Sequence, residues 1–76
     1  MFGLLLLRQI LQQVREFVGM IKEDLVAERI AIDSYRGMIE YIGDQDPTTS
    51  EMLKGILAVE EEHADELADL LQDLPK

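Results

Sequence analysis

The sequence has no cysteine and few basic residues. Without cysteine there is no disulfide framework, no cysteine-ligated zinc finger and no thiol chemistry. Only 7 basic residues stand against 16 acidic ones, which gives a formal net charge of −9. Nucleic-acid phosphates and anionic membrane surfaces both attract basic proteins, so we expect neither as a partner. An acidic surface instead attracts cations.

Long apolar runs are also missing. The leucine run from Leu4 to Leu7 is far shorter than the roughly 20 residues that cross a bilayer. It has no charged leading region and no evident cleavage site, so no secretory signal is predicted and a cytoplasmic protein is expected. The 76 residues, 47% of them hydrophobic, indicate one small domain. A core of this size is marginal alone, so a metal or a partner subunit is expected to stabilise it.

Two helices explain the pattern of apolar residues, and no segment has a strand pattern. Apolar side chains recur at steps of three and four, which keeps them on one helical face. The spacing predicts a helix over about 4–42, a turn over 43–47 and a second helix over about 48–74. A connection this short makes the helices antiparallel neighbours. The predicted fold is all-α, an antiparallel two-helix hairpin that dimerises into a four-helix bundle.

The turn contains two alternative starts for the second helix. Gly43 suits the left-handed residue that ends a helix. Thr48 with Glu51 has the form of a capping box, whereas Asp46 followed by Pro47 is an N-cap with proline at the first helical position. The pattern leaves both starts open.

Each predicted helix has one seam of side chains that face the core. The first seam contains Leu4, Leu7, Leu11, Val14, Val18, Ile21, Leu25, Glu28, Ile32, Tyr35, Ile39 and Ile42. The second contains Leu53, Ile56, Glu60, His63, Leu67, Leu70 and Leu74. Glu28, Glu60 and His63 are therefore predicted to point inward, where an unpaired charge is costly. Carboxylate with imidazole suits iron, manganese or zinc better than calcium.

These three residues are expected to meet in space. Glu60 and His63 are three apart, so they lie one above the other on one face. Glu28 lies at a similar distance from the turn on the other helix, and therefore at a similar height. A twofold dimer would bring together four carboxylates and two imidazoles, enough to neutralise two divalent cations. The alternatives are a polar layer that fixes helix pairing, or a hydrogen-bonded core histidine.

Three other features have more than one reading. Tyr35, two turns after Glu28 on the same face, is either a core residue or a hydrogen-bond partner of a metal-binding carboxylate. The acidic face formed by Glu62, Glu66, Asp69 and Asp73 is either a solvated exterior or a funnel for cations. The apolar start of the first helix, with Phe2, Leu4–Leu7, Ile10, Leu11 and Val14, is predicted to be a self-association surface. A frayed terminus and a membrane-touching segment are the alternatives for that start.

Four segments of the sequence resemble the C-terminal helical pair of bacterioferritin and related ferritin-like proteins. They are Asp24–Arg29, Tyr35–Arg36, Gly43–Thr49 and Ile56–Asp65, within a resemblance that covers about residues 14–74. The resemblance implies that Glu28 is a terminal iron ligand, that Glu60 bridges two irons and that His63 binds one of them. It implies a role for Tyr35 in catalysis and a di-iron cofactor, with manganese or zinc as alternatives.

The resemblance also implies an activity, which is oxidation of Fe(II) by O₂ or H₂O₂ for iron storage or detoxification. This chain has half the helices of a usual member, so a homodimer or higher homo-oligomer is expected, and half-sized encapsulated ferritins make a shell protein and a nanocompartment further expectations. Glu61 stands where bacterioferritins have the haem methionine, so no haem is expected. Two alternatives remain: a manganese or peroxide-linked oxidoreductase, and a non-enzymatic helical assembly module.

Overall fold

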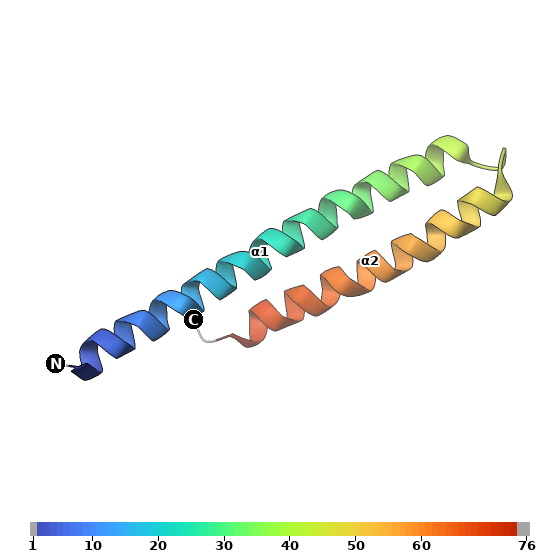
Figure 1. Cartoon of the computed structure of the whole chain (residues 1–76). Coiled ribbons are helices and arrows are strands. Elements are labelled where there is room, and N and C mark those ends of the chain that lie inside the picture. Colours follow the sequence, from blue (N-terminus) through green and yellow to red (C-terminus); the bar gives the residue numbers. More distant parts are fainter. Residues whose placement is uncertain (1, 75–76) are drawn as a thin grey trace.

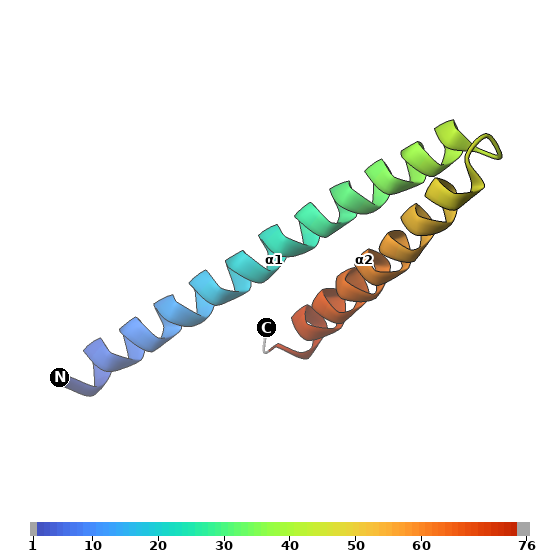
Figure 2. The same ribbon diagram turned by 45° about the vertical axis from the view of Figure 1, so that its right-hand side comes forward.

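Two antiparallel helices form the computed structural model, which describes residues 2–74 apart from the side chain of Phe2 (Figure 1). Helix α1 spans Phe2–Ile42 and helix α2 spans Pro47–Asp73. The hairpin is a thin rod, 67 × 16 × 16 Å, with one helix beside the other from the turn to the end of α2 (Figure 2). The described part of the chain contains no strand, so the predicted all-α hairpin is confirmed. Its dimerisation is a separate prediction, which a single chain does not test.

The turn uses one of the two starts predicted for the second helix. Gly43 has φ 53°, a left-handed conformation, and its N–H donates to the carbonyl of Ile39 at 2.9 Å. Asp46 is the N-cap, and its carboxylate accepts from the N–H of Thr49 at 3.1 Å and from the Thr49 hydroxyl at 2.6 Å. The hydroxyl bond, followed by the N–H bond, lowers the pKa of Asp46. Because Asp46 is the N-cap and Pro47 the first helical residue, the helix uses the Asp46 start, and the alternative N-cap at Thr48 is wrong by two positions.

A narrow core lies between the helices. Buried side chains come from both helices: Ile21, Leu25, Ile32, Ser50, Leu53 and Ala64. Half-buried apolar residues of α2 pack against this core, namely Leu57, Leu67, Ala68 and Leu71. No large side chain described in the structure is fully buried, so most of the apolar surface is still exposed in a single hairpin.

The seam predicted for α2 is shifted from the one that contacts α1. Leu57, Ala64 and Leu71 pack toward α1, while His63 and Leu70, one position away from Ala64 and Leu71, are exposed. The apolar stripe of α2 is wider than one helix–helix contact, and α1 covers only one edge of it. His63 is therefore exposed in a single hairpin, and its inward orientation in a bundle of two hairpins stays a prediction.

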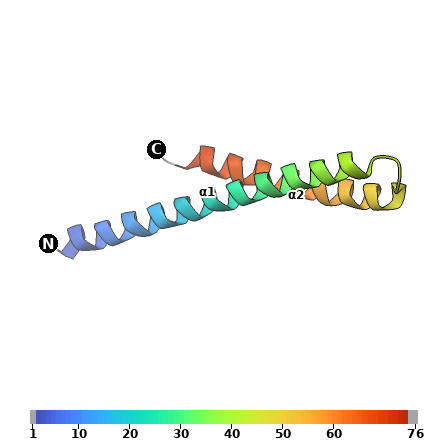
Figure 3. The same ribbon diagram turned by 90° about the horizontal axis from the view of Figure 1, so that it is seen from above.

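The start of α1 extends past the end of α2 (Figure 3). α1 has 41 residues and α2 has 27, so roughly 14 residues, about 21 Å at 1.5 Å each, have no α2 beside them. We call residues 3–15 the overhang. Its large apolar side chains are 47–67% exposed: Leu4, Leu5, Leu6, Leu7, Ile10, Leu11 and Val14. The predicted contribution of the Phe2 side chain lies outside the described residues. Over the described range, neither helix combines the length and apolarity needed to cross a membrane.

Candidate metal centre

The three predicted ligands come together at one point between the helices. Glu28 of α1 and Glu60 and His63 of α2 each offer one ligand atom, and these atoms all lie within 4.8 Å of one another. Glu60 and His63 are one helical turn apart, and the antiparallel pairing brings Glu28 to the same height from the other side. A single cation can contact all three groups at this separation after small side-chain adjustments.

The burial of these residues is graded across the cluster. Glu28 and Glu60 are half-buried, while His63 is exposed. The Oε2 atom of Glu28 is out of contact with solvent and has no hydrogen-bond partner. A buried carboxylate oxygen without a partner is costly, because it has lost water without gaining a donor. A bound cation satisfies such an oxygen, so the donor set and its environment both fit a metal ion.

An open groove runs along the cluster. It is lined by Asp24, Ala27, Glu28, His63, Glu66, Leu67 and Leu70. The alanine and the two leucines form an apolar wall, whereas Asp24 and Glu66 add two carboxylates beside the ligands. The sequence did not single out Asp24, and it placed Glu66 on an acidic face that was either a solvated exterior or a funnel for cations. Their spacing was the available signal, since Asp24 is four residues before Glu28 and Glu66 is three after His63.

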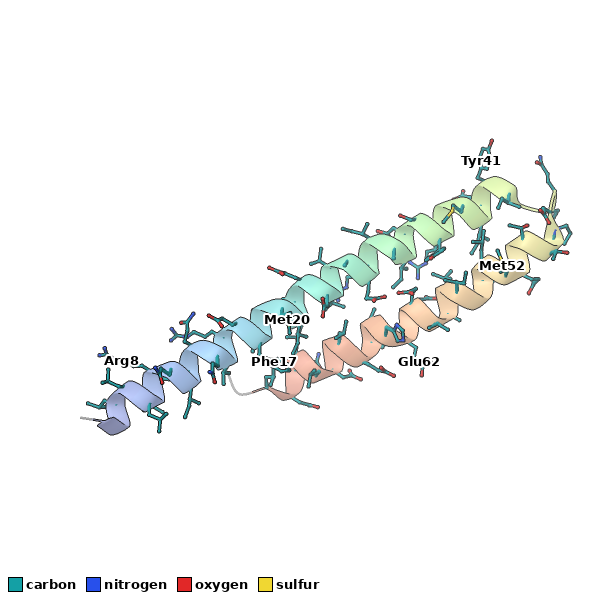
Figure 4. All side chains as sticks on the ribbon, viewed as in Figure 1. Arg8, Phe17, Met20, Tyr41, Met52 and Glu62 are labelled. Atoms are coloured by element: carbon teal, nitrogen blue, oxygen red, sulfur yellow. The ribbon has the colours of Figure 1, made fainter. Side chains whose placement is uncertain are left out.

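The groove lies on a face of the hairpin that is largely apolar and uncovered. On α2, steps of eleven, four and seven from His63 lead to Met52, Val59 and Leu70, which are 58%, 48% and 40% exposed. Steps from Glu28 along α1 lead to Met38, which is 42% exposed. Figure 4 labels Met52 on α2, together with Phe17 and Met20 on α1. We call this surface, centred on Glu28 and His63, the open face.

Tyr35 lies on the same stripe of α1 as Glu28, and its side chain is half-buried. Two helical turns, about 10.5 Å of rise, separate the two residues. Among the described residues the structure gives no hydrogen bond for the Tyr35 hydroxyl. Its proposed contact with a metal-binding carboxylate therefore stays a prediction.

The other acidic residues of α2 lie mostly away from the cluster. Glu62, labelled in Figure 4, points away from α1, and Asp69 and Asp73 are exposed. Only Glu66 of this acidic face lines the groove. The solvated-exterior reading therefore describes most of the face, and a cation funnel would have to act through Glu66.

Glu61 illustrates why register matters in a run of three glutamates. Its Oε2 accepts from the Arg36 guanidinium at 2.9 Å on the opposite side of the hairpin. Glu60, one position earlier, is the residue that meets Glu28 and His63. The geometry thus separates a carboxylate in an ion pair from one in the cluster, although the two are adjacent in sequence.

Comparison with known proteins gives one family. The family model described as Ferritin, a ferritin-like domain, matches residues 6–76. No curated protein matches the chain.

Proposed function

The chain belongs to the ferritin-like domain family, and we propose that it binds Fe(II) at a two-iron centre shared between two copies and oxidises it to Fe(III). The observation that carries this proposal is the cluster itself. Two carboxylates and an imidazole converge within 4.8 Å, and the buried oxygen of one carboxylate has no partner. The mixed oxygen and nitrogen donor set suits iron, manganese or zinc, and the family favours iron among them.

One chain supplies too few ligands for two metals. Glu28, Glu60 and His63 give a charge of −2 and three donor residues, which suits a single divalent ion with several open positions. A twofold copy doubles the set to four carboxylates and two imidazoles, whose charge balances two divalent ions. The open face offers an apolar surface on which a second hairpin can pack. We therefore propose a homodimer as the smallest active unit.

Each group of the chain has a defined task in this proposal. Glu28 and Glu60 supply charge to hold the substrate iron, and the ring of His63 binds in its neutral form. Leu67 and Leu70 keep bulk water out of the groove once a partner covers it, and Asp24 and Glu66 raise the local concentration of cations. When two Fe(II) are bound, each gives one electron to O₂, which takes up two protons and leaves as H₂O₂.

Iron titration under anaerobic conditions tests the proposal. The apoprotein receives Fe(II) while its solution mass is measured, and air is then admitted while ferric absorbance in the near ultraviolet is followed. We expect two metals per dimer, followed by oxidation much faster than that of free Fe(II) in the same buffer. Binding without accelerated oxidation would contradict ferroxidation and favour a different metal or oxidant. No binding by a stable dimer would leave only a helical assembly module.

A further inference from the structure

The dimer proposed above leaves part of α1 uncovered. A twofold axis at the height of Glu28 and His63 places the partner's turn as far above the centre as the chain's own turn lies below it. Fourteen residues, or about 21 Å, separate Glu28 from Ile42, so the partner's turn reaches only to about residue 14 of α1. The overhang extends beyond that point. Its seven exposed leucine, isoleucine and valine side chains therefore need a different partner.

The apolar pattern of the overhang predicts what kind of partner fits. Ile10, Leu11, Val14 and Leu7 lie on the side of α1 that faces α2 further along the helix, and they are spaced at the three- and four-residue steps of a helix seam. The seam continues from the intrachain core into a space that α2 does not enter. The missing element is therefore a helix with an apolar stripe, in line with α2.

The seam has a symmetry that fits a second copy of the same segment. Leu4, Leu7, Leu11 and Val14 are spaced by three, four and three residues, a pattern that reads identically in both directions about Gln9. An antiparallel copy centred on Gln9 sets Leu4 against Val14 and Leu7 against Leu11. Such self-complementarity is the requirement for a twofold contact between identical segments.

The length of α2 leaves room for this pair. Counting back from the turn, α2 ends level with about residue 16 of α1, so the row beside residues 3–15 is free of the chain's own α2. An incoming overhang can lie in that row.

The overhang also differs in charge from the rest of the chain. Its charged residues are Arg8 and Arg15, whereas the chain as a whole has a net charge of −9. The two arginines directly follow Leu7 and Val14, so they flank the seam, while Gln9 and Gln12 lie farther round the helix. Two overhangs therefore pair through a segment without carboxylates, and the arginine heads stay in water at the edge of the contact.

We propose that the overhangs of two copies pair antiparallel through Leu4, Leu7, Leu11 and Val14, and that this contact joins the metal-binding dimers into larger assemblies. The overhang is thus a second self-association surface, separate from the open face. The pairing itself does not depend on iron, so it remains testable if the proposed ferroxidase activity is absent.

Matched charge substitutions test the surface in the full chain. Leu7→Glu with Leu11→Glu places two carboxylates on the seam, while Gln9→Glu with Gln12→Glu places the same charge on the outer face. We expect the first variant to fall to the mass of the metal-binding dimer in sedimentation, and the second to keep the full mass of the unaltered chain. Both should keep the same number of metals per chain, since neither pair touches the centre. Equal masses for all three proteins would overturn the proposal.

Introduced cysteines test the direction of pairing, because the chain has no cysteine of its own. Chains with Leu4→Cys and with Val14→Cys are mixed, allowed to exchange and oxidised. Antiparallel pairing predicts a disulfide between the two variants, with little cross-linking in either variant alone. Cross-linking of each variant only with itself would overturn the antiparallel register. Two results together would instead indicate a lipid-binding segment and overturn the proposal. The unaltered chain would float with phosphatidylcholine vesicles, and its mass in sedimentation would not exceed that of the Leu7→Glu, Leu11→Glu variant.

Discussion

The two grooves between α1 and α2 are made by the same pair of helices, yet their surfaces differ. One groove, on the open face, holds Glu28 and His63 beside Leu67 and Leu70. The other holds Arg29, Asp33, Arg36, Glu61 and Asp65, with Arg36 and Glu61 joined at 2.9 Å. Acidic residues are present in both. The second groove includes two arginines beside its three acids, while the lining of the first includes no lysine or arginine.

The difference shows what each side of the hairpin can tolerate. Mixed charges and an ion pair suit a surface that remains in water. Unbalanced carboxylates next to apolar side chains are unfavourable there, and still more so after burial against a partner, unless a cation joins them. The absence of a basic residue from the first groove is therefore consistent with a site in which the cation comes from solution.

The largest expected effect is the loss of metal affinity when a carboxylate of the first groove is removed. Removal of a carboxylate from the second groove serves as the comparison. Glu28→Ala takes away the carboxylate with the unpartnered oxygen, and we expect metal affinity to fall at least ~100-fold, about 2.7 kcal/mol. Glu61→Ala is the matched control, since it deletes an adjacent acid that is held by Arg36, and affinity should change less than threefold. Calorimetric titration with Zn²⁺ or anaerobic Fe(II) measures both. Equal losses in the two variants would mean that the chain holds cations only through its general negative charge.

The next largest effect is expected on dimerisation through the open face. Leu70→Lys adds a charge to the apolar edge of the first groove, whereas Gln72→Lys adds the same charge to an exposed position on another side of α2. Burial of an unpaired lysine in an interface is strongly unfavourable, so we expect Leu70→Lys to abolish the metal-binding dimer at micromolar concentration. Sedimentation of metal-loaded protein should show the dimer intact in Gln72→Lys. A Leu70→Lys variant that still dimerises with two metals would place the partner on another face.

Tyrosine variants sharpen the comparison at the level of chemistry. Tyr35 is half-buried on the stripe of Glu28, while Tyr41 is 89% exposed. We expect Tyr35→Phe to slow iron oxidation about 10-fold with unchanged metal stoichiometry, because it removes the hydroxyl that is proposed to bond a metal-binding carboxylate but keeps the ring. Tyr41→Phe should leave the rate unchanged. Stopped-flow absorbance after mixing with aerated buffer separates the two, and identical rates in both variants would assign Tyr35 to packing alone.

Removing charge from the centre should also affect the metal-free protein. Glu60→Gln keeps the shape of the side chain but lowers the repulsion among carboxylates that a dimer brings together. We expect the apo variant to be more stable than the unaltered apo chain by on the order of 1 kcal/mol in urea, and to lose the stabilisation that metal gives. A destabilised apo variant would indicate that Glu60 is needed for helix pairing rather than for metal.

Much of this arrangement could be predicted from the sequence. Steps of three and four, together with distance from the turn, fix the heights of Glu28, Glu60 and His63, and the structure brings these three together. The edge of α2 that meets α1 could not be chosen, because Ala64 and His63 belong to the same wide stripe. The positions of Asp24 and Glu66 in the groove were hidden for a similar reason, as one more acid is uninformative in a chain this acidic.

The smallest expected effect is on the ion pair of the second groove. The side chains of Arg36 and Glu61 are 59% and 44% exposed, so solvent screens their attraction. We expect Arg36→Ala to cost at most about 1 kcal/mol of unfolding free energy, with the difference shrinking as salt rises. Its effect on metal affinity should be slight, because the freed Glu61 carboxylate lies across the hairpin from the ligands. If Arg36→Ala instead tightened metal binding severalfold, the Glu61 carboxylate would be able to reach the metal centre. The ion pair with Arg36, rather than the register of the helix, would then be what keeps Glu61 away from the ligands.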